Sequence, residues 1–185
     1  AFYSNTDGFG NTAFGKSALF TNSGGDFNCA SGYESMLLNT TGNYNSAYGV
    51  SALRYNTSGD GNTGFGYGSL LLNTTGIYNT ATGTNALHAN TTGNFNVANG
   101  LAALFSNTTG TNNTAIGSAS LFNSMQNSFN VAVGDSTLFS YNNGGANASG
   151  ISQHGSAATA CGCDRCNVHP PVTIQIPNGH VCRTE

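Results

Sequence analysis

Charge is scarce in this sequence. Only 6% of the residues are Asp, Glu, Lys or Arg, against about 25% in an ordinary soluble domain, and none of them lies between Asp60 and Asp135. Because so few cations cannot form a basic patch, we do not expect binding of nucleic acid through its phosphates. No apolar run approaches the roughly 20 residues of a membrane span. No signal peptide is visible and the first residue is not Met, so we interpret the sequence as a mature or trimmed chain.

Groups for catalysis or cofactor binding are also few. The histidines have no recurring Ser and Asp partners, and they are His88, His154, His169 and His180. Asp7, Asp26 and Asp60 stand where turns are expected, and Asp is a common turn residue. The glycine-rich segments are not followed by the G-K-[ST] of a phosphate-binding loop. We therefore expect no enzyme activity, no resident cofactor and no catalytic metal ion.

Asn, Gly, Thr and Ser, by contrast, make up about half of the chain, and they recur in a unit of 17 residues. An Asn marks each unit, and from it we number the positions 0 to 16: Asn11, Asn28, Asn45, Asn62, Asn79, Asn96, Asn113 and Asn130. Position 4 is always Gly: Gly15, Gly32, Gly49, Gly66, Gly83, Gly100, Gly117 and Gly134. Position 8 is a large apolar residue: Leu19, Met36, Leu53, Leu70, Leu87, Leu104, Leu121 and Leu138. Position 2 is Ala in every unit except one.

This repeat predicts an all-β solenoid, a β-roll or β-helix of about eight coils, over residues 1–146. Seventeen residues are too few for a helical hairpin repeat, which needs about 33, and Gly and Asn at this density break helices. We expect two or three short strands per coil, with coils about 4.8 Å apart and a rod on the order of 40 Å long. The Leu column is the expected core. The Asn at position 0 is expected either to form an amide ladder between coils or simply to suit the turn.

Position 14 is expected to be a left-handed turn. It is Gly in seven of the eight units, and in the remaining one it is Asn127. Asn is the residue next best to Gly at tolerating a positive φ. The substitution therefore predicts φ > 0 throughout this column.

Position 9 is mostly large and apolar, yet it also holds Arg54 and His88. Two interpretations remain: a half-buried rim within one chain, or a stripe that packs against a sister chain or the tail. The candidates for such a lateral interface are Phe20, Leu37, Leu71, Phe105, Phe122 and Phe139.

N-glycosylation sequons recur in the units. In a secreted chain they could carry glycans, and the candidates are Asn39, Asn56, Asn73, Asn90, Asn107, Asn112 and Asn147. Five of them share one column, where full glycans on every rung would crowd. The alternative is that N-T-T-G is simply the sequence of a corner.

Residues 147–185 form a different segment, which we expect to be a small β-rich cap or docking element. Residues 172–176 alternate apolar and polar residues as a strand does. Two disulfides, a metal site that also uses His169 or His180, or reduced thiols are the alternatives for Cys161, Cys163, Cys166 and Cys182. Cys29, in the repeats, is expected to be a buried or half-buried small residue. At the other end the first residues match the second half of a unit, so an upstream coil or another subunit is expected to stack there.

The unit N-T-A-x-G-x-x-A-L resembles the head repeats of trimeric autotransporter adhesins, the YadA-like β-roll, and repeats of phage-type tail fibres that end in a self-cleaving chaperone domain. The resemblance covers roughly residues 5–146. It implies a surface-exposed β-solenoid, often trimeric, that acts in adhesion. The period of 17 is longer than is usual in those heads, and the Cys-rich tail is foreign to them.

Three hypotheses of function follow. The first is a structural subunit of an extracellular fibre or filament, built by end-to-end stacking of coils and docking of the tail onto copies of itself. The second is an adhesin or fibre head on a cell or virion surface that binds a surface glycan. The third is ice binding, suggested by the paired Thr columns such as Thr40-Thr41 and Thr74-Thr75.

Overall fold

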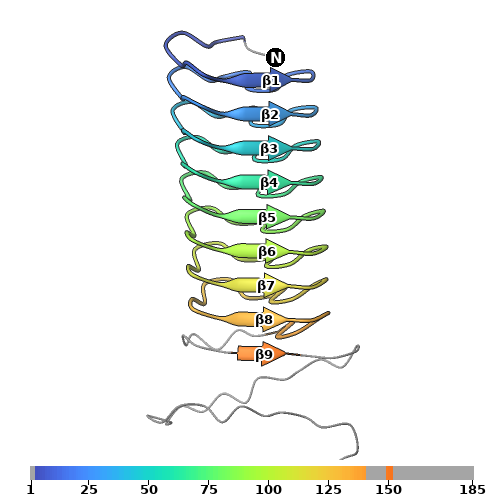
Figure 1. The fold of residues 1–185 in the computed structure, drawn as a ribbon. Helices are drawn as coiled ribbons and strands as arrows, with labels where there is room; N and C mark the ends of the chain where they lie inside the picture. Colours follow the sequence, from blue (N-terminus) through green and yellow to red (C-terminus); the bar gives the residue numbers. More distant parts are fainter. Residues whose placement is uncertain (1–2, 141–148, 152–185) are drawn as a thin grey trace, which may run out of the picture.

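The chain forms a β-solenoid in which one short parallel strand per coil stacks into a single sheet (Figure 1). The computed structural model describes residues 3–140 and 149–151, and these residues include no helix. The sheet has nine strands in sequence order: β1 (Thr12–Phe14), β2 (Cys29–Ser31), β3 (Ser46–Tyr48), β4 (Thr63–Phe65), β5 (Thr80–Thr82), β6 (Val97–Asn99), β7 (Thr114–Ile116), β8 (Val131–Val133) and β9 (Ser149–Ile151). The predicted solenoid fold is confirmed.

The strand register repeats without change through eight coils. Ala13 pairs with Ala30, Ala30 with Ala47, and each further step up to Ala132 is again 17 residues. From β8 to β9 the step is 18 residues, because Ala132 pairs with Gly150. The sheet therefore continues past residue 146, where we expected the repeat domain to end, and does so with one residue inserted. Asn147 lies outside the described residues, as does the tail beyond residue 151.

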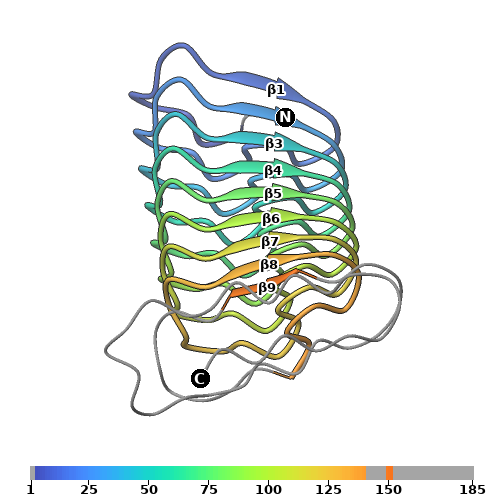
Figure 2. The ribbon, with the colours of Figure 1, turned by 60° about the horizontal axis from the view of Figure 1, so that its bottom comes forward.

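Between successive strands from β1 to β8, each coil consists of turns rather than the second and third strands expected from the sequence. These turns follow the same path in every coil (Figure 2), and backbone hydrogen bonds join each coil to the next. Leu53 N donates to Ser69 O at 3.0 Å, for example, and Thr74 N donates to Thr91 O at 3.0 Å. The peptide groups of the turns are thus paired between coils as a ladder pairs those of a sheet.

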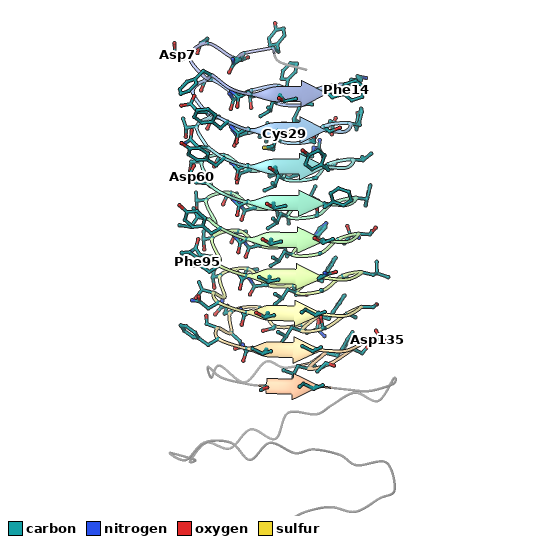
Figure 3. All side chains as sticks on the ribbon, viewed as in Figure 1. Asp7, Phe14, Cys29, Asp60, Phe95 and Asp135 are labelled. Atoms are coloured by element: carbon teal, nitrogen blue, oxygen red, sulfur yellow. The ribbon has the colours of Figure 1, made fainter. Side chains whose placement is uncertain are left out.

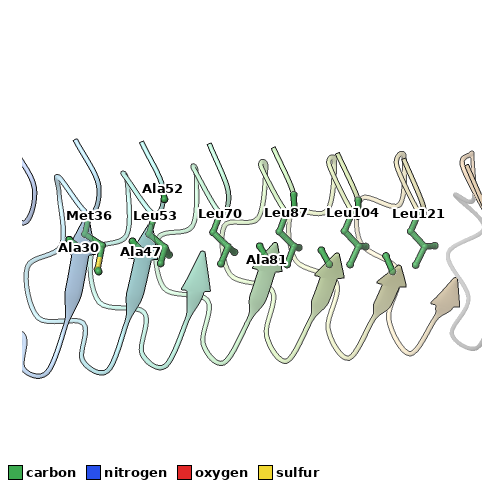
Figure 4. Close-up of a cluster of buried hydrophobic side chains, with 14 of the residues drawn as sticks. Ala30, Met36, Ala47, Ala52, Leu53, Leu70, Ala81, Leu87, Leu104 and Leu121 are labelled. Carbon is green, nitrogen blue, oxygen red and sulfur yellow. The ribbon is translucent and has the colours of Figure 1, made fainter. Parts of the chain in front are cut away.

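One Leu or Met side chain per coil fills the interior, as Figure 4 shows. The Leu column is fully buried from Leu19 to Leu121, and Leu138 is 2% exposed. Ala side chains at positions 2 and 7 line the same narrow core, Ala47 and Ala52 among them. Burial stabilises each such Leu by roughly 1.5–3 kcal/mol relative to an exposed one. The core is therefore a single continuous column along the rod.

The Leu column adopts a left-handed backbone, which the sequence did not lead us to expect. Its φ values lie between 47° and 53°, a region that costs an L-residue about 1–2 kcal/mol. Positions 6 and 16 are left-handed as well, at Ser17 and Phe27 for example. Each coil turns its corners at these positions, so burial and hydrogen bonding offset strain in every unit.

The expectation of a positive φ at position 14 is wrong. The glycines of this column among the described residues, Gly25 and Gly42 for example, are not left-handed. A Cβ on Gly42 would instead lie 2.5 Å from the Gly59 carbonyl oxygen and 2.6 Å from Asn39 Oδ1. Gly is required because the neighbouring backbone and an amide side chain approach too closely for any side chain.

Candidate functional site

Two ladders of buried Asn side chains run along the interior. In the first, at position 0, Asn62 N and Asn62 Nδ2 both donate to Asn45 Oδ1, at 2.9 and 3.1 Å. Asn62 Nδ2 also donates to Gly76 O at 2.8 Å. The same pattern joins the other members of the column, so the amide ladder between coils is present. Because each amide bonds both neighbours, the ladder fixes the distance and register between coils.

The second ladder, at position 11, consists of the Asn residues of the recurring sequons. Asn56 Nδ2 donates to Asn39 Oδ1 at 2.7 Å and to Gly59 O at 2.9 Å, and the column is fully buried. N-glycosylation would have to occupy this same nitrogen. The candidate glycosylation sites in this column are therefore wrong for the folded chain: Asn39, Asn56, Asn73, Asn90 and Asn107.

The two remaining sequon positions differ. Asn112 is exposed at the surface of the rod, and its Nδ2 lies 3.4 Å from Thr111 Oγ1. It stays a candidate glycosylation site. Asn147 lies outside the described residues.

The position 9 column is a half-buried rim, stacked mostly on itself. The Phe105 ring lies between those of His88 and Phe122, with centroids 4.8 and 5.0 Å away, and Phe122 stacks on Phe139 at 5.0 Å. Phe20, Leu37 and Leu71 are also half-buried. Contacts within the chain cover much of the apolar surface of this column, and other columns expose more apolar surface. Burial lowers the pKa of His88 below 6.5.

A row of exposed rings along one edge of the rod stands at position 16, which we did not single out from the sequence. They belong to Phe27, Tyr44, Tyr78, Phe95 and Phe129, and Figure 3 places Phe95 at this edge. Phe27 stacks on Tyr44 with centroids 5.3 Å apart, and Tyr78 stacks on Phe95 at 5.5 Å. All five are left-handed, with φ between 53° and 60°. Gly10, Gly61 and Asn112, the other described residues of the column, were the available signal, because Gly and Asn tolerate that backbone.

A second exposed apolar edge lies at the other end of the strands, where Figure 3 shows Phe14. Positions 3 and 5 flank the corner Gly there. Phe14 is 76% exposed, and Phe65, Tyr67 and Leu101 are more than half exposed. This edge carries larger apolar groups than the predicted stripe at position 9.

The cations of the described residues lie in the first three coils. Arg54 Nε lies 2.9 Å from Glu34 Oε2, an ion pair that is not aligned as a hydrogen bond. Lys16 Nζ lies 5.8 Å from the centroid of the Tyr33 ring. A hydrogen bond to Glu34 and the negative charge of that carboxylate raise the pKa of Tyr33. The later coils up to Asp135 have no charged side chain.

The thiol of Cys29 is half-buried in the outer face of β2 and unbridged. Its Sγ lies 3.1 Å from Tyr48 Oη, and either atom can be the donor. This contact and the charge of the thiolate raise the pKa of Tyr48. The tail cysteines lie outside the described residues, so the alternatives for them stay open.

The Thr pairs do not form a flat array of free hydroxyls. Thr40 and Thr74, at position 12, donate to the carbonyl oxygens of Thr57 and Thr91 in the next coil, at 2.8 and 3.0 Å. Only their neighbours at position 13, such as Thr41 and Thr75, are exposed. The two columns of each pair thus point differently, which weakens the basis for ice binding.

No family model, curated protein or solved structure matches the chain. Within residues 3–140 and 149–151, no three His, Cys, Asp or Glu side chains gather as a metal site would need. The described part of the chain likewise has no helix long and apolar enough to cross a membrane.

Proposed function

We propose that the chain is a structural subunit of an extracellular fibre, extended by the head-to-tail addition of parallel coils. The observation that carries the proposal is the constant register of seven successive strand pairs, from β1–β2 to β7–β8. The face that one coil presents to the next is the same along the rod. A contact of this kind is heterologous, and because it repeats by translation it does not close into a ring.

The edge of β1 supports this assembly. Thr12 N donates to Asn28 O at 2.8 Å, and Phe14 O accepts from Gly32 N at 2.8 Å. Since successive residues of a strand direct their peptide groups to opposite sides, the N–H and C=O of Ala13 face away from β2. Among the strands of the described residues none lies on that side of β1, and these groups are placed to pair with one further parallel strand.

The buried Asn ladders favour a mechanical role. They tie each coil to both neighbours through side-chain amides in addition to the backbone, as in cross-β assemblies. The resemblance to surface fibres supports an extracellular location. We also propose that residues 147–185 dock onto the next copy of the chain and that the fibre contains this chain alone.

Matched proline variants test the assembly. Ala13→Pro removes the donor that faces the free edge, whereas Thr12→Pro removes a donor used inside the chain. Sedimentation velocity of the full chain should show concentration-dependent growth for wild type and Thr12→Pro, and loss of growth for Ala13→Pro. Circular dichroism checks that both variants keep their strands. Undiminished growth of a folded Ala13→Pro variant would contradict addition at β1.

A further inference from the structure

The outer face of the sheet carries no charge. Successive side chains of a strand point to opposite sides, so the first and third residues of each strand, at positions 1 and 3, share the face that lies opposite the interior. All of these residues in β1 to β9 are uncharged, and all are half-buried or exposed. The charged side chains of the described residues stand at positions 5, 6, 9, 13 and 15 instead. A partner that covers the two columns therefore meets no charge on them.

The two columns of this face differ in size. From β1 to β8, position 1 holds only Thr, Ser, Cys or Val. Position 3 also holds large side chains, which are exposed: Phe14, Tyr48, Phe65 and Ile116. Wherever position 3 is large, position 1 of the same strand is Thr or Ser. The face therefore consists of a low column beside a column with high points.

The face is also regular along the rod. The strand register is constant from β1 to β8, and Figure 1 shows the strands stacked in one direction. Sheets of many strands normally twist, and flat ones depend on stacking or on side-chain ladders, which the two Asn columns supply here. A partner that packs in the same way on every strand must have the same period. A second copy of the chain meets this condition.

We propose that two copies of the chain pair through the outer faces of their sheets, related by a twofold axis parallel to the rod. This rotation reverses the strand direction in the second copy, so position 3 of one copy lies opposite position 1 of the other. Each large side chain then meets a small one: Phe14 meets the partner's Thr12, and Phe65 meets the partner's Thr63. The contact is isologous, with the two sheets about 10 Å apart and their side chains interdigitated as in a steric zipper.

The pairing rests on the proposed fibre for its full strength. Two columns of side chains on eight strands are a narrow strip compared with the roughly 800 Å² per partner of a stable dimer, so single chains should pair weakly. Because the twofold axis runs along the rod, both copies point the same way and grow at the same end. Each head-to-tail addition then lengthens the contact. Hydroxyl groups in the strip can pair along it, since Thr63 and Thr80 are neighbours in register and adjacent Thr side chains form hydrogen bonds in sheets.

The test is small-angle X-ray scattering of the full chain over a range of concentration, which separates the mass per unit length of rods from their length. We expect the wild-type rods to contain two chains per cross-section as they grow. Val97→Lys/Val131→Lys changes two exposed residues of position 1 and places charges without partners between the two sheets, which is strongly unfavourable. This variant should show half the wild-type mass per unit length, while its rods still lengthen with concentration.

The matched control is Thr75→Lys/Thr92→Lys, which adds the same charge at exposed position 13, outside the two columns. It should keep the wild-type mass per unit length, and circular dichroism checks that both variants keep their strands. One or three chains per cross-section in wild-type rods would overturn the pairing, and so would an unchanged mass per unit length in Val97→Lys/Val131→Lys. Rods that lengthen with one chain per cross-section leave the fibre standing without the pairing, whereas paired particles that never lengthen contradict the fibre alone.

Discussion

Asn56 Nδ2 donates to Asn39 Oδ1 across one coil spacing, at 2.7 Å, and to the Gly59 carbonyl of its own coil at 2.9 Å. The same amide thus closes a corner and joins two coils. Gly59 cannot carry a side chain there, because a Cβ would lie 2.5 Å from Asn56 Oδ1. The N-T-T-G sequence is a structural corner in which the Asn and the Gly require each other.

Removal of one rung of this ladder should destabilise the rod strongly. Asn73→Ala deletes the amide that donates to Asn56 Oδ1 and accepts from Asn90 Nδ2. We expect a loss of roughly 1–3 kcal/mol for each of these two buried groups left without its partner. Urea unfolding monitored by circular dichroism measures it. Thr75→Ala, at the exposed position 13, is the control and should lie within about 0.5 kcal/mol of wild type.

Relief of strain at position 6 should stabilise the fold. Ala102 has φ 54°, so Ala102→Gly should raise the free energy of unfolding by about 0.5–1 kcal/mol, because the left-handed penalty exceeds the entropy that Gly adds to the unfolded chain. Ala103, its neighbour, is buried and not left-handed. Ala103→Gly should therefore lower stability, and thermal unfolding of the pair of variants compares the two. Equal effects of both substitutions would contradict the assigned backbone.

The corner Gly column should not accept Ala. A Cβ on Gly83 would lie 2.6 Å from the Gly100 carbonyl oxygen, and φ there is 124°. Both coils would have to separate, so we expect Gly83→Ala to cost several kcal/mol, at the severe end of single substitutions. Gly24→Ala is the matched control, because a Cβ there meets nothing within 4 Å. A thermal shift assay should show a large drop for the first and little change for the second.

His88 should make stability depend on pH. Burial lowers its pKa below 6.5, so between the folded pKa and 6.5 the unfolded chain binds more protons than the folded one. Stability from this group is then complete above 6.5 and falls as the pH drops toward the folded pKa. His88→Phe, which continues the ring stack with Phe105, should flatten this part of the profile. The test is to measure the melting temperatures of the wild type and of His88→Phe from about pH 8 to pH 5. The same pH dependence in both proteins would contradict this role of His88.

The sequence predicted the solenoid because its constant period and its Leu column both indicate short coils stacked around a narrow core. It failed where one residue type serves two purposes. Gly at position 14 suggested a left-handed turn, yet Gly42 is there to avoid the Gly59 carbonyl. The positive φ of Leu53 was not predicted. A Leu at a core position is expected from the repeat whatever its backbone conformation, so the sequence does not indicate the strain.

Whether a residue of the repeat is a candidate site depends on whether its column faces the interior or the solvent. The 17-residue pattern does not show which of the two applies. Asn56 satisfies the sequon pattern as well as an exposed Asn would, but it lies inside the coil. Phe95 was not singled out from the sequence. The Gly and Asn substitutions in its column become informative once the corner is known to be left-handed, since they show that the ring is dispensable for the fold.

Electron microscopy of negatively stained full-length chain, prepared over a hundredfold range of concentration, tests the fibre account most directly. Head-to-tail addition predicts rods of constant width whose length increases with concentration and far exceeds the roughly 40 Å of eight coils spaced as strands are. Particles of one short length at every concentration would contradict it.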